Sequence, residues 1–171
     1  DHLSIGEVRH HGRASMSPSW KQLIRRLGDR GILPVVQGST DDTLGALHLR
    51  FYAPLEADWL SENDRSVAVR IDGPTRSVLL TGDLESIGER HLTGQEIGTV
   101  DILQAGHHGS RTSTGQALLD ALGPKMVVGS MGYRNRHGFP HAEVLERLRR
   151  ATISLYRTDL DGGIRFSLDS A

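Results

Sequence analysis

Two apolar segments that each run into a polar tip constrain the fold of this chain more than any other feature. Residues 77–83 read SVLLTGD, and residues 100–110 read VDILQAGHHGS. The apolar run in each is typical of a strand that is covered on both faces. Strands of one sheet that end at the same edge bring Asp83 close to His107. Because carboxylate and imidazole groups suit a divalent metal such as zinc or manganese, the pattern indicates a metal site at that edge.

Each tip also has a purely structural interpretation. An aspartate after a strand often serves a turn or a helix N-cap, and adjacent histidines such as His107 and His108 also occur on solvated loops. Glycines frame both tips and let the backbone bend sharply beside a bound ion. The combination therefore favours a site more than either tip alone.

Composition excludes some classes of protein and leaves others open. The 171 residues suffice for one domain with a real core. A formal net charge of −1, from 20 basic and 21 acidic side chains, gives no global electrostatic case for nucleic-acid binding. The absence of cysteine rules out disulfides and thiolate metal sites. The sequence contains no apolar run near the ~20 residues that span a bilayer.

Hydrophobic spacing predicts a mixed sheet covered by helices. A helix is expected to begin at Ser17-Pro18 and to end between Gly28 and Gly31. Glu85 and Glu89 suit the start and body of a later helix, and Ser113 is expected to cap another. The remaining expectations are strands at 5–8, 32–37, 47–52, 126–128, 153–156 and 164–168, a hairpin at 66–82, helices at 84–92, 113–122 and 141–150, and a polar turn at 38–44.

Several motifs together resemble one family. LLTGD is followed by DILQAGHHGSRTS, VVGSMGYRNRHGFPH and YRTDLDGGIRF, and LSENDRSVAVRI comes before them. Over residues 60–168 the chain resembles the metallo-β-lactamase-like domain of ComEC-type DNA-uptake (competence) proteins. The resemblance implies an α/β fold, the metallo-β-lactamase-like αββα four-layer sandwich.

The same resemblance implies a larger parent protein. Since the chain opens at Asp1 without a methionine, we expect residues 1–171 to be a single metallo-β-lactamase-like domain that lacks its N-terminal portion. The parent would be an integral membrane protein of bacteria, and this domain would lie on the extracytoplasmic side of the inner membrane. Single-stranded DNA and the channel portion of the parent chain are the expected partners.

The resemblance also implies the roles of individual residues. Asp83 would bridge the metals, His107 would be a ligand, and His108 would be a further ligand or support one; the three form the expected catalytic and metal set. The expected cofactor is divalent manganese or zinc, with no organic cofactor. The residues expected to orient a phosphate or line the mouth of the site are Ser110, Thr112, Asn135, Arg136, His137 and His141.

The chain departs from the family pattern at three places. The early His-x-His-x-Asp-His motif is absent, unless Asp1-His2 is its end. Asn63-Asp64 stands where many relatives carry a ligand histidine. A late loop at residues 132–140 has Phe139 where close relatives have another histidine. Each departure removes an imidazole, which leaves two or three ligands.

Three functions therefore stay open. The first is a metal-dependent phosphodiesterase or nuclease domain that hydrolyses the DNA strand that is not imported. The second is a metal-poor scaffold that binds DNA or partner proteins without catalysis. The third is a standalone hydrolase of the same fold that acts on a small ester or phosphoester. Tyr133, beside Arg134 and Arg136, is the candidate platform for stacking a DNA base, and a loop tyrosine packed on the surface is the alternative.

Overall fold

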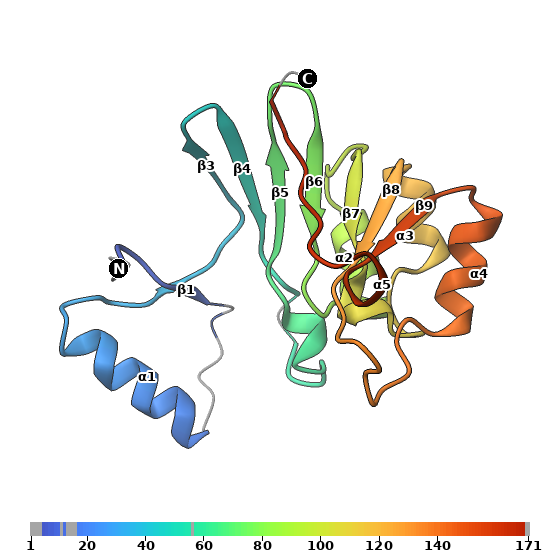
Figure 1. Cartoon of the computed structure of the whole chain (residues 1–171). Helices are drawn as coiled ribbons and strands as arrows, with labels where there is room; N and C mark the ends of the chain where they lie inside the picture. The colour runs from blue at the N-terminus through green and yellow to red at the C-terminus, as the bar shows by residue number, and fades with distance from the viewer. Residues whose placement is uncertain (1–4, 11, 13–16, 56, 170–171) are drawn as a thin grey trace.

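A seven-stranded sheet organises the part of the chain that this computed structural model describes, which is residues 5–10, 12, 17–55 and 57–169 (Figure 1). The first four strands form an antiparallel meander, and the last three join it in parallel. In spatial order the strands are β3 (Thr40–Leu44), β4 (Leu47–Tyr52), β5 (Ala68–Asp72), β6 (Ser77–Leu80), β7 (Ile102–Gln104), β8 (Met126–Gly129) and β9 (Ser154–Arg157).

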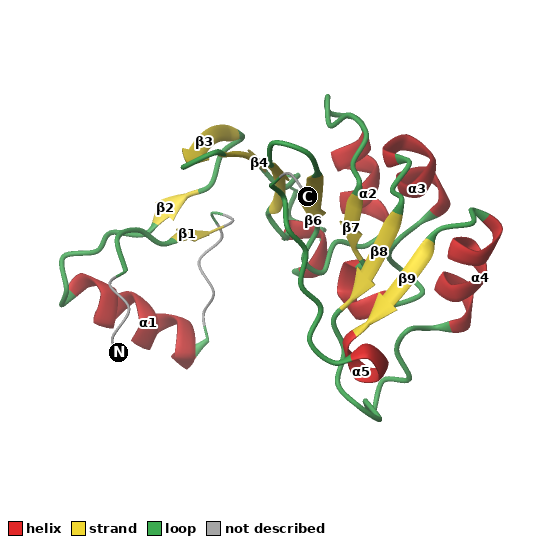
Figure 2. Ribbon diagram, turned by 45° about the horizontal axis from the view of Figure 1, so that its top comes forward, coloured by secondary structure: helices red, strands yellow, loops and turns green. Residues whose placement is uncertain are grey.

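Three helices connect the parallel strands and lie on one side of the sheet (Figure 2). They are α2 (Ser86–Thr93), α3 (Gln116–Leu122) and α4 (Ala142–Arg150). Right-handed crossovers between neighbouring parallel strands place successive helices on the same face. The core lies between this helix layer and the sheet, where Leu79, Leu103 and Val127 occupy neighbouring positions and are fully buried.

The opposite face of the sheet is apolar and only partly covered. Leu80 pairs with Val69 on this face, and Leu80 is 39% exposed. The segment 162–169 crosses it (Figure 1), with the ring of Phe166 edge-on to Tyr156 at 6.2 Å. Of the four layers expected, the described residues therefore contain one helix layer and one large sheet.

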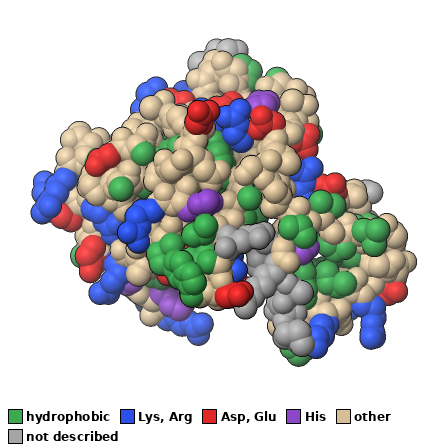
Figure 3. Space-filling view, turned by 180° about the vertical axis from the view of Figure 1, so that it is seen from behind, with side chains coloured by type: hydrophobic (Ala, Val, Ile, Leu, Met, Phe, Trp, Pro, Cys, Tyr) green, Lys and Arg blue, Asp and Glu red, His purple; other side chains and the backbone are tan. Residues whose placement is uncertain are grey.

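The N-terminal part lies to one side of this sheet (Figure 1) and contacts its edge through Arg9, whose guanidinium lies 3.3 Å from Asp42 Oδ2 and 4.9 Å from the ring centre of Phe51. It contains α1 (Pro18–Gly28) and a two-stranded parallel pair of β1 (Arg9–His10) and β2 (Val35–Val36). The predicted cap of α1 is confirmed, because Ser17 Oγ accepts the N–H of Trp20 at 3.1 Å. Hydrophobic side chains lie at the surface of this part (Figure 3), and Leu33 is 78% exposed.

Four local predictions differ from the structure. Residues 40–44 form strand β3 and not a turn, and the first strand is β1 at Arg9–His10 and not residues 5–8. Residues 164–168 form no strand; a short helix, α5 (Thr158–Asp161), precedes them. The N-cap of α3 is Gly115 and not Ser113. Two 3₁₀ turns, η1 (Asn63–Arg65) and η2 (Gly106–Gly109), complete the elements around the site.

Candidate functional site

The two polar tips that the sequence singles out lie side by side. β6 and β7 are adjacent and parallel, so both run out at one edge of the sheet. The N–H of His107 donates to the carbonyl of Gly82 at 3.0 Å, which ties one tip to the other. The contact of Asp83 is made with His108, however, and not with His107 as the sequence suggested.

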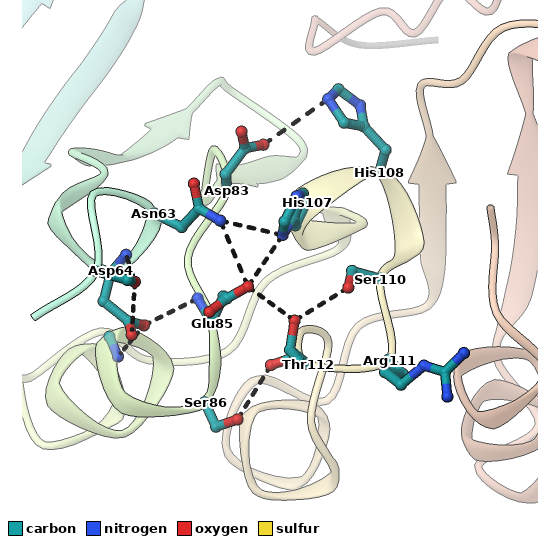
Figure 4. A network of polar contacts seen from close by, with 12 residues as sticks. Asn63, Asp64, Asp83, Glu85, Ser86, His107, His108, Ser110, Arg111 and Thr112 are labelled. Carbon is teal, nitrogen blue, oxygen red and sulfur yellow. Dashed lines mark hydrogen bonds and ion pairs between the residues drawn. The ribbon is translucent and has the colours of Figure 1, made fainter. Parts of the chain in front are cut away.

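His108 is held with one ring nitrogen facing Asp83 (Figure 4). Its Nδ1 lies 2.7 Å from the carbonyl oxygen of Ser130. Because a carbonyl only accepts, Nδ1 carries the hydrogen, and in the neutral ring Nε2 bears the lone pair. That Nε2 lies 3.8 Å from Asp83 Oδ1, with both side chains nearly half exposed. Two electron-rich atoms that face each other are the arrangement that a cation between them would stabilise.

His107 is embedded in a polar network behind this pair (Figure 4). Its Nδ1 lies 3.2 Å from Glu85 Oε1 and 3.4 Å from Asn63 Nδ2. The hydroxyl of Thr112 donates to the same Glu85 oxygen at 3.0 Å, and Ser110 Oγ lies 3.0 Å from Thr112 Oγ1. Ser110 and Thr112 thus lie behind His107 and contact it through Glu85.

The backbone of the two histidines is strained. His107 and His108 have φ values of 46° and 58°, and Gly109 follows with 88°. A non-glycine residue in this region costs on the order of 1–3 kcal/mol and persists only where its surroundings enforce it. Here a Cβ on Gly109 would lie 2.7 Å from Pro140 Cβ, so the late loop packs directly against the turn. Such strain gathers at functional sites.

The late loop closes one side of an open pocket of about 440 Å³. Asn135 shapes the loop, since its side chain accepts the N–H of Phe139 at 2.8 Å and donates to the carbonyl of Phe139 at 2.9 Å. His137 stacks on Phe139 with ring centres 5.3 Å apart. The lining residues are Asp83, His107, His108, Ser130, Met131, Gly132, Asn135, His137 and Phe139.

Arg136 and His141 flank this pocket. Arg136 is exposed, with its Nε 3.3 Å from His137 Nε2. His141 uses Nδ1 to accept the N–H of Arg111 at 2.9 Å, and its ring meets Phe139 edge-on. The sequence-based set therefore divides into residues that line the pocket and residues that hold or border its walls.

Two buried carboxylates accept backbone N–H groups at the starts of the helices next to the site. Asp64, which is 3% exposed, accepts the N–H of Glu85 at 3.0 Å and of Gly88 at 2.8 Å at the start of α2. Glu89 accepts the N–H groups of Thr114 and Gly115 at the start of α3. Burial raises the pKa of Glu89 above its ordinary value, although these two N–H groups act in the opposite direction.

Sequence reasoning missed Glu85, Ser130, Met131 and Phe139 as site residues. The position of Glu85 next to Leu84 and ahead of a helix predicts a capping role, yet its side chain caps nothing in α2. Asp64 caps α2 instead, which leaves the Glu85 side chain to contact His107. Because Asp64 reaches α2 only in the tertiary fold, the sequence carries no local signal for this role of Glu85. Asn63 was noted for standing where relatives carry a histidine, and it does lie against His107.

The donor chemistry of the site fits a divalent cation, while the number of donors is small. Asp83 offers a carboxylate oxygen, and His107 and His108 offer imidazole nitrogens beside it. Among the described residues, no group of three or more His, Cys, Asp or Glu side chains is placed to hold a metal. Asp1 and His2, the alternative end of the early motif, lie outside the described residues. The described residues therefore supply part of a ligand set.

Comparison with known proteins identifies relatives by sequence. The chain is 37% identical over 119 residues to Recombination protein 2 of Haemophilus influenzae and 38% identical over 120 residues to Competence protein ComA of Neisseria gonorrhoeae, covering 70% and 69% of this chain. It is 31% identical over 184 residues to ComE operon protein 3 of Bacillus subtilis, covering 97% of this chain. The alignments span only 15%, 17% and 23% of those three proteins. No family model matches the chain.

Comparison with solved structures gives one that shares the fold of this chain. CmlA, a diiron β-hydroxylase from Streptomyces venezuelae, aligns over 89% of this chain and 38% of its own length, with a TM-score of 0.59 and 18% identity. A protein described as a Zn-dependent hydrolase of the metallo-β-lactamase superfamily from Thermotoga maritima aligns over 70% of this chain and 60% of its own length, with a TM-score of 0.44 and 17% identity.

Within the described residues, none of the helices is long and apolar enough to cross a membrane. The α/β fold expected from the sequence is confirmed, as is the resemblance to ComEC-type competence proteins. The chain, with its metallo-β-lactamase-like fold, belongs to the family of ComEC-type competence proteins.

Proposed function

We propose that this chain is a hydrolytic domain of a bacterial DNA-uptake protein, and that it cleaves phosphodiester bonds at the edge where β6 and β7 end. The observation that carries the proposal is the pair of Asp83 and His108, whose Oδ1 and Nε2 atoms face each other at 3.8 Å at a pocket of about 440 Å³. The relation to competence proteins supports DNA as the substrate, and the exposed pair supports metal-assisted hydrolysis.

The metal would be divalent manganese or zinc, held in part by Asp83, His107 and His108. Such a metal, when bound, lowers the pKa of a coordinated water and stabilises the negative charge that develops on a phosphate. The chain's own residues would fix the orientation of the ligand side chains and the shape of the pocket. The carbonyl of Ser130 fixes the ring of His108, and Phe139 walls the pocket on the side of the late loop.

The proposed substrate is single-stranded DNA, and specifically the strand that is not imported. Tyr133 is 72% exposed, and the guanidinium of Arg134 lies 5.2 Å from its ring centre. Residues 130–140 contain two arginines and no acidic side chain, and Gly132, Asn135 and His137 of this segment line the pocket. An exposed aromatic ring beside cationic groups suits a base stacked next to a phosphate backbone.

The proposed partner is the channel portion of the same parent protein, and the proposed location is the extracytoplasmic side of the bacterial inner membrane. The small share of each relative that the chain spans, 15–23%, supports a larger parent. Both proposals rest on the resemblance described above.

A cleavage assay on labelled single-stranded DNA tests the enzymatic proposal. The protein is supplied with manganese or zinc, and Asp83→Ala is compared with Asp42→Ala, a control for a carboxylate on the exposed strand β3. We expect Asp83→Ala to lose more than ~100-fold in rate, because a metal's charge contributes several kcal/mol to the transition state. Asp42→Ala should cleave like the unaltered chain, and equal cleavage by all three proteins would contradict the proposal.

One observation favours a second function, binding without cleavage. The described residues present fewer than three grouped ligands, which suits a scaffold that holds DNA or a partner protein. Measuring DNA binding by fluorescence anisotropy, with and without a chelator, separates the two functions. Binding that is unaffected by the chelator, together with no cleavage in either metal, would support the scaffold.

A further inference from the structure

One oxygen of Glu85 collects the polar groups that surround His107. Glu85 Oε1 lies 3.0 Å from the Thr112 hydroxyl, 3.2 Å from His107 Nδ1 and 3.4 Å from Asn63 Nδ2 (Figure 4). The side chains of Glu85 and His107 are only 25% and 26% exposed. This geometry is that of an acceptor shared by several donors.

The contacts determine which nitrogen of His107 carries the hydrogen. A carboxylate accepts and cannot donate, so Nδ1 must donate for its 3.2 Å contact with Glu85 to be favourable. In the other neutral tautomer, the lone pair of Nδ1 would face the carboxylate. Nδ1–H is therefore the form that satisfies Glu85, and the lone pair lies on Nε2. The amide of Asn63, which lies 3.4 Å from Nδ1, then donates to the same Glu85 oxygen at 3.4 Å and not to the ring.

The Glu85 side chain is free to accept from His107 because Asp64, and not Glu85, caps the start of α2. Glu85 stands at the N-cap of α2, where a side chain ordinarily accepts a backbone N–H of the first turn. Asp64 accepts the N–H groups of Glu85 and Gly88 instead. A Cβ on Gly88 would lie 3.1 Å from Asp64 Oδ1, so the small residue permits this close approach. The carboxylate of Glu85 is left to reach His107.

The neighbouring histidine is held in the same way. His108 donates through Nδ1 to the carbonyl of Ser130, which leaves its Nε2 unprotonated in the neutral ring. Both histidines line the pocket. The two rings therefore share one tautomer, fixed by a backbone group for His108 and by a side chain for His107.

We infer that Glu85 is a positioning residue, which fixes His107 as the Nδ1–H tautomer and reserves its Nε2 lone pair for a ligand in the pocket. A hydrogen-bonded carboxylate behind a histidine both orients the ring and raises its basicity toward a metal. The ligand in question rests on the function proposed above, whereas the tautomer of His107 does not.

The matched variants are Glu85→Gln and Glu85→Met. Both keep the length of the side chain, but only glutamine keeps an oxygen that can accept from Nδ1. The measurement is a long-range ¹H–¹⁵N spectrum of the metal-free protein, labelled at histidine nitrogen, at pH ~8.5, where a free imidazole is neutral. His108 serves as the internal reference, because its partner is the backbone of Ser130.

We expect an unprotonated Nε2 on His107 in the unaltered chain and in Glu85→Gln, and a shift toward protonated Nε2 in Glu85→Met, with His108 unchanged throughout. A protonated Nε2 on His107 in the unaltered chain would overturn the inference even if Glu85→Met failed to fold. An unchanged His107 in a folded Glu85→Met protein would overturn it as well.

Metal titration separates this inference from the proposed function. If both hold, Glu85→Met should weaken metal binding by 10–100-fold, the typical effect of removing the partner of a ligand histidine. If the unaltered chain binds no metal while His107 shows the expected tautomer, the metal role proposed for the site fails and the positioning role of Glu85 stands.

Discussion

The site has a floor and a mouth that are built differently. The floor consists of Asp64, Glu89, Ser113 and Thr114, all of which are buried. The mouth consists of Asp83, His108, Tyr133 and His137, whose side chains are nearly half to largely exposed. The floor fixes where helices α2 and α3 begin, whereas the mouth presents side chains to solvent. The difference indicates that stability depends on the floor, whereas the proposed chemistry would depend on the mouth.

The largest effect should come from comparing two aspartates, one from each region. Asp64→Ala leaves the N–H groups of Glu85 and Gly88 without their acceptor, so we expect a loss of about 2–4 kcal/mol in the free energy of unfolding. Asp83→Ala removes a half-exposed carboxylate and should change stability by ~0.5 kcal/mol or less. Urea unfolding of the two variants measures both values.

A destabilisation of similar size in both variants would remove the distinction between floor and mouth. Asp42→Ala again serves as the control for loss of an exposed carboxylate, and it should match Asp83→Ala in stability.

A smaller effect is expected at the mouth, on binding and not on folding. Tyr133→Ala should weaken the binding of a single-stranded oligonucleotide by ~1–3 kcal/mol, which is what a stacked base typically contributes. Tyr133→Phe keeps the ring and should bind like the unaltered chain. Fluorescence anisotropy in a chelator measures binding without cleavage, and neither variant should shift the melting temperature, because Tyr133 is 72% exposed. Equal affinity of the alanine variant would exclude Tyr133 as a platform.

The smallest effect should appear in the dependence of stability on pH. Burial raises the pKa of Glu89, so its contribution to stability is fully present below the unfolded pKa and is lost as pH rises through the folded pKa.

The pKa of Asp101 is shifted in the opposite direction. The ammonium of Lys125, which donates to Asp101 at 2.7 Å, and the N–H of Ser77 lower the pKa of Asp101. Its contribution is present above the unfolded pKa and is lost as pH falls through the folded one.

Urea unfolding as a function of pH, for Glu89→Gln and Asp101→Asn beside the unaltered chain, tests these two directions. Relative to Glu89→Gln, the unaltered chain should gain stability as pH falls from neutral toward 4.5, the ordinary pKa of glutamate. Relative to Asp101→Asn, it should lose stability as pH falls below 3.8, the ordinary pKa of aspartate. Parallel pH curves for all three proteins would contradict both assignments.

The parts of the fold with a strong local signal could be predicted from sequence. The hairpin at 66–82 alternates apolar and polar residues, and β5 and β6 pair as expected. The apolar runs at 78–80 and 102–103 lie in adjacent strands, which brings the two polar tips together. Ser17-Pro18 carries its own start signal, and the helix begins there.

The parts that depend on tertiary partners could not be predicted. β3 reads TDDTL, a sequence without a hydrophobic period, and it is exposed along its whole length. It forms a strand because it pairs with β4, where Arg50 donates to Asp41 at 2.8 Å. The alternating residues near 164–168 suggested a strand, yet the segment lies across the sheet and contacts Tyr156 through Phe166. Glu85 and Glu89 looked alike as helix residues, and only the fold shows that one faces His107 and the other caps α3.

The metal site at the ends of β6 and β7 is tested by measuring the metal content of the purified chain after dialysis against manganese or zinc, by elemental analysis beside Asp83→Ala and Asp42→Ala. We expect about one or two equivalents in the unaltered chain and in Asp42→Ala, and a clear loss in Asp83→Ala. The absence of metal from all three proteins, or the same content in all three, would contradict the claim that the ends of β6 and β7 form a metal site.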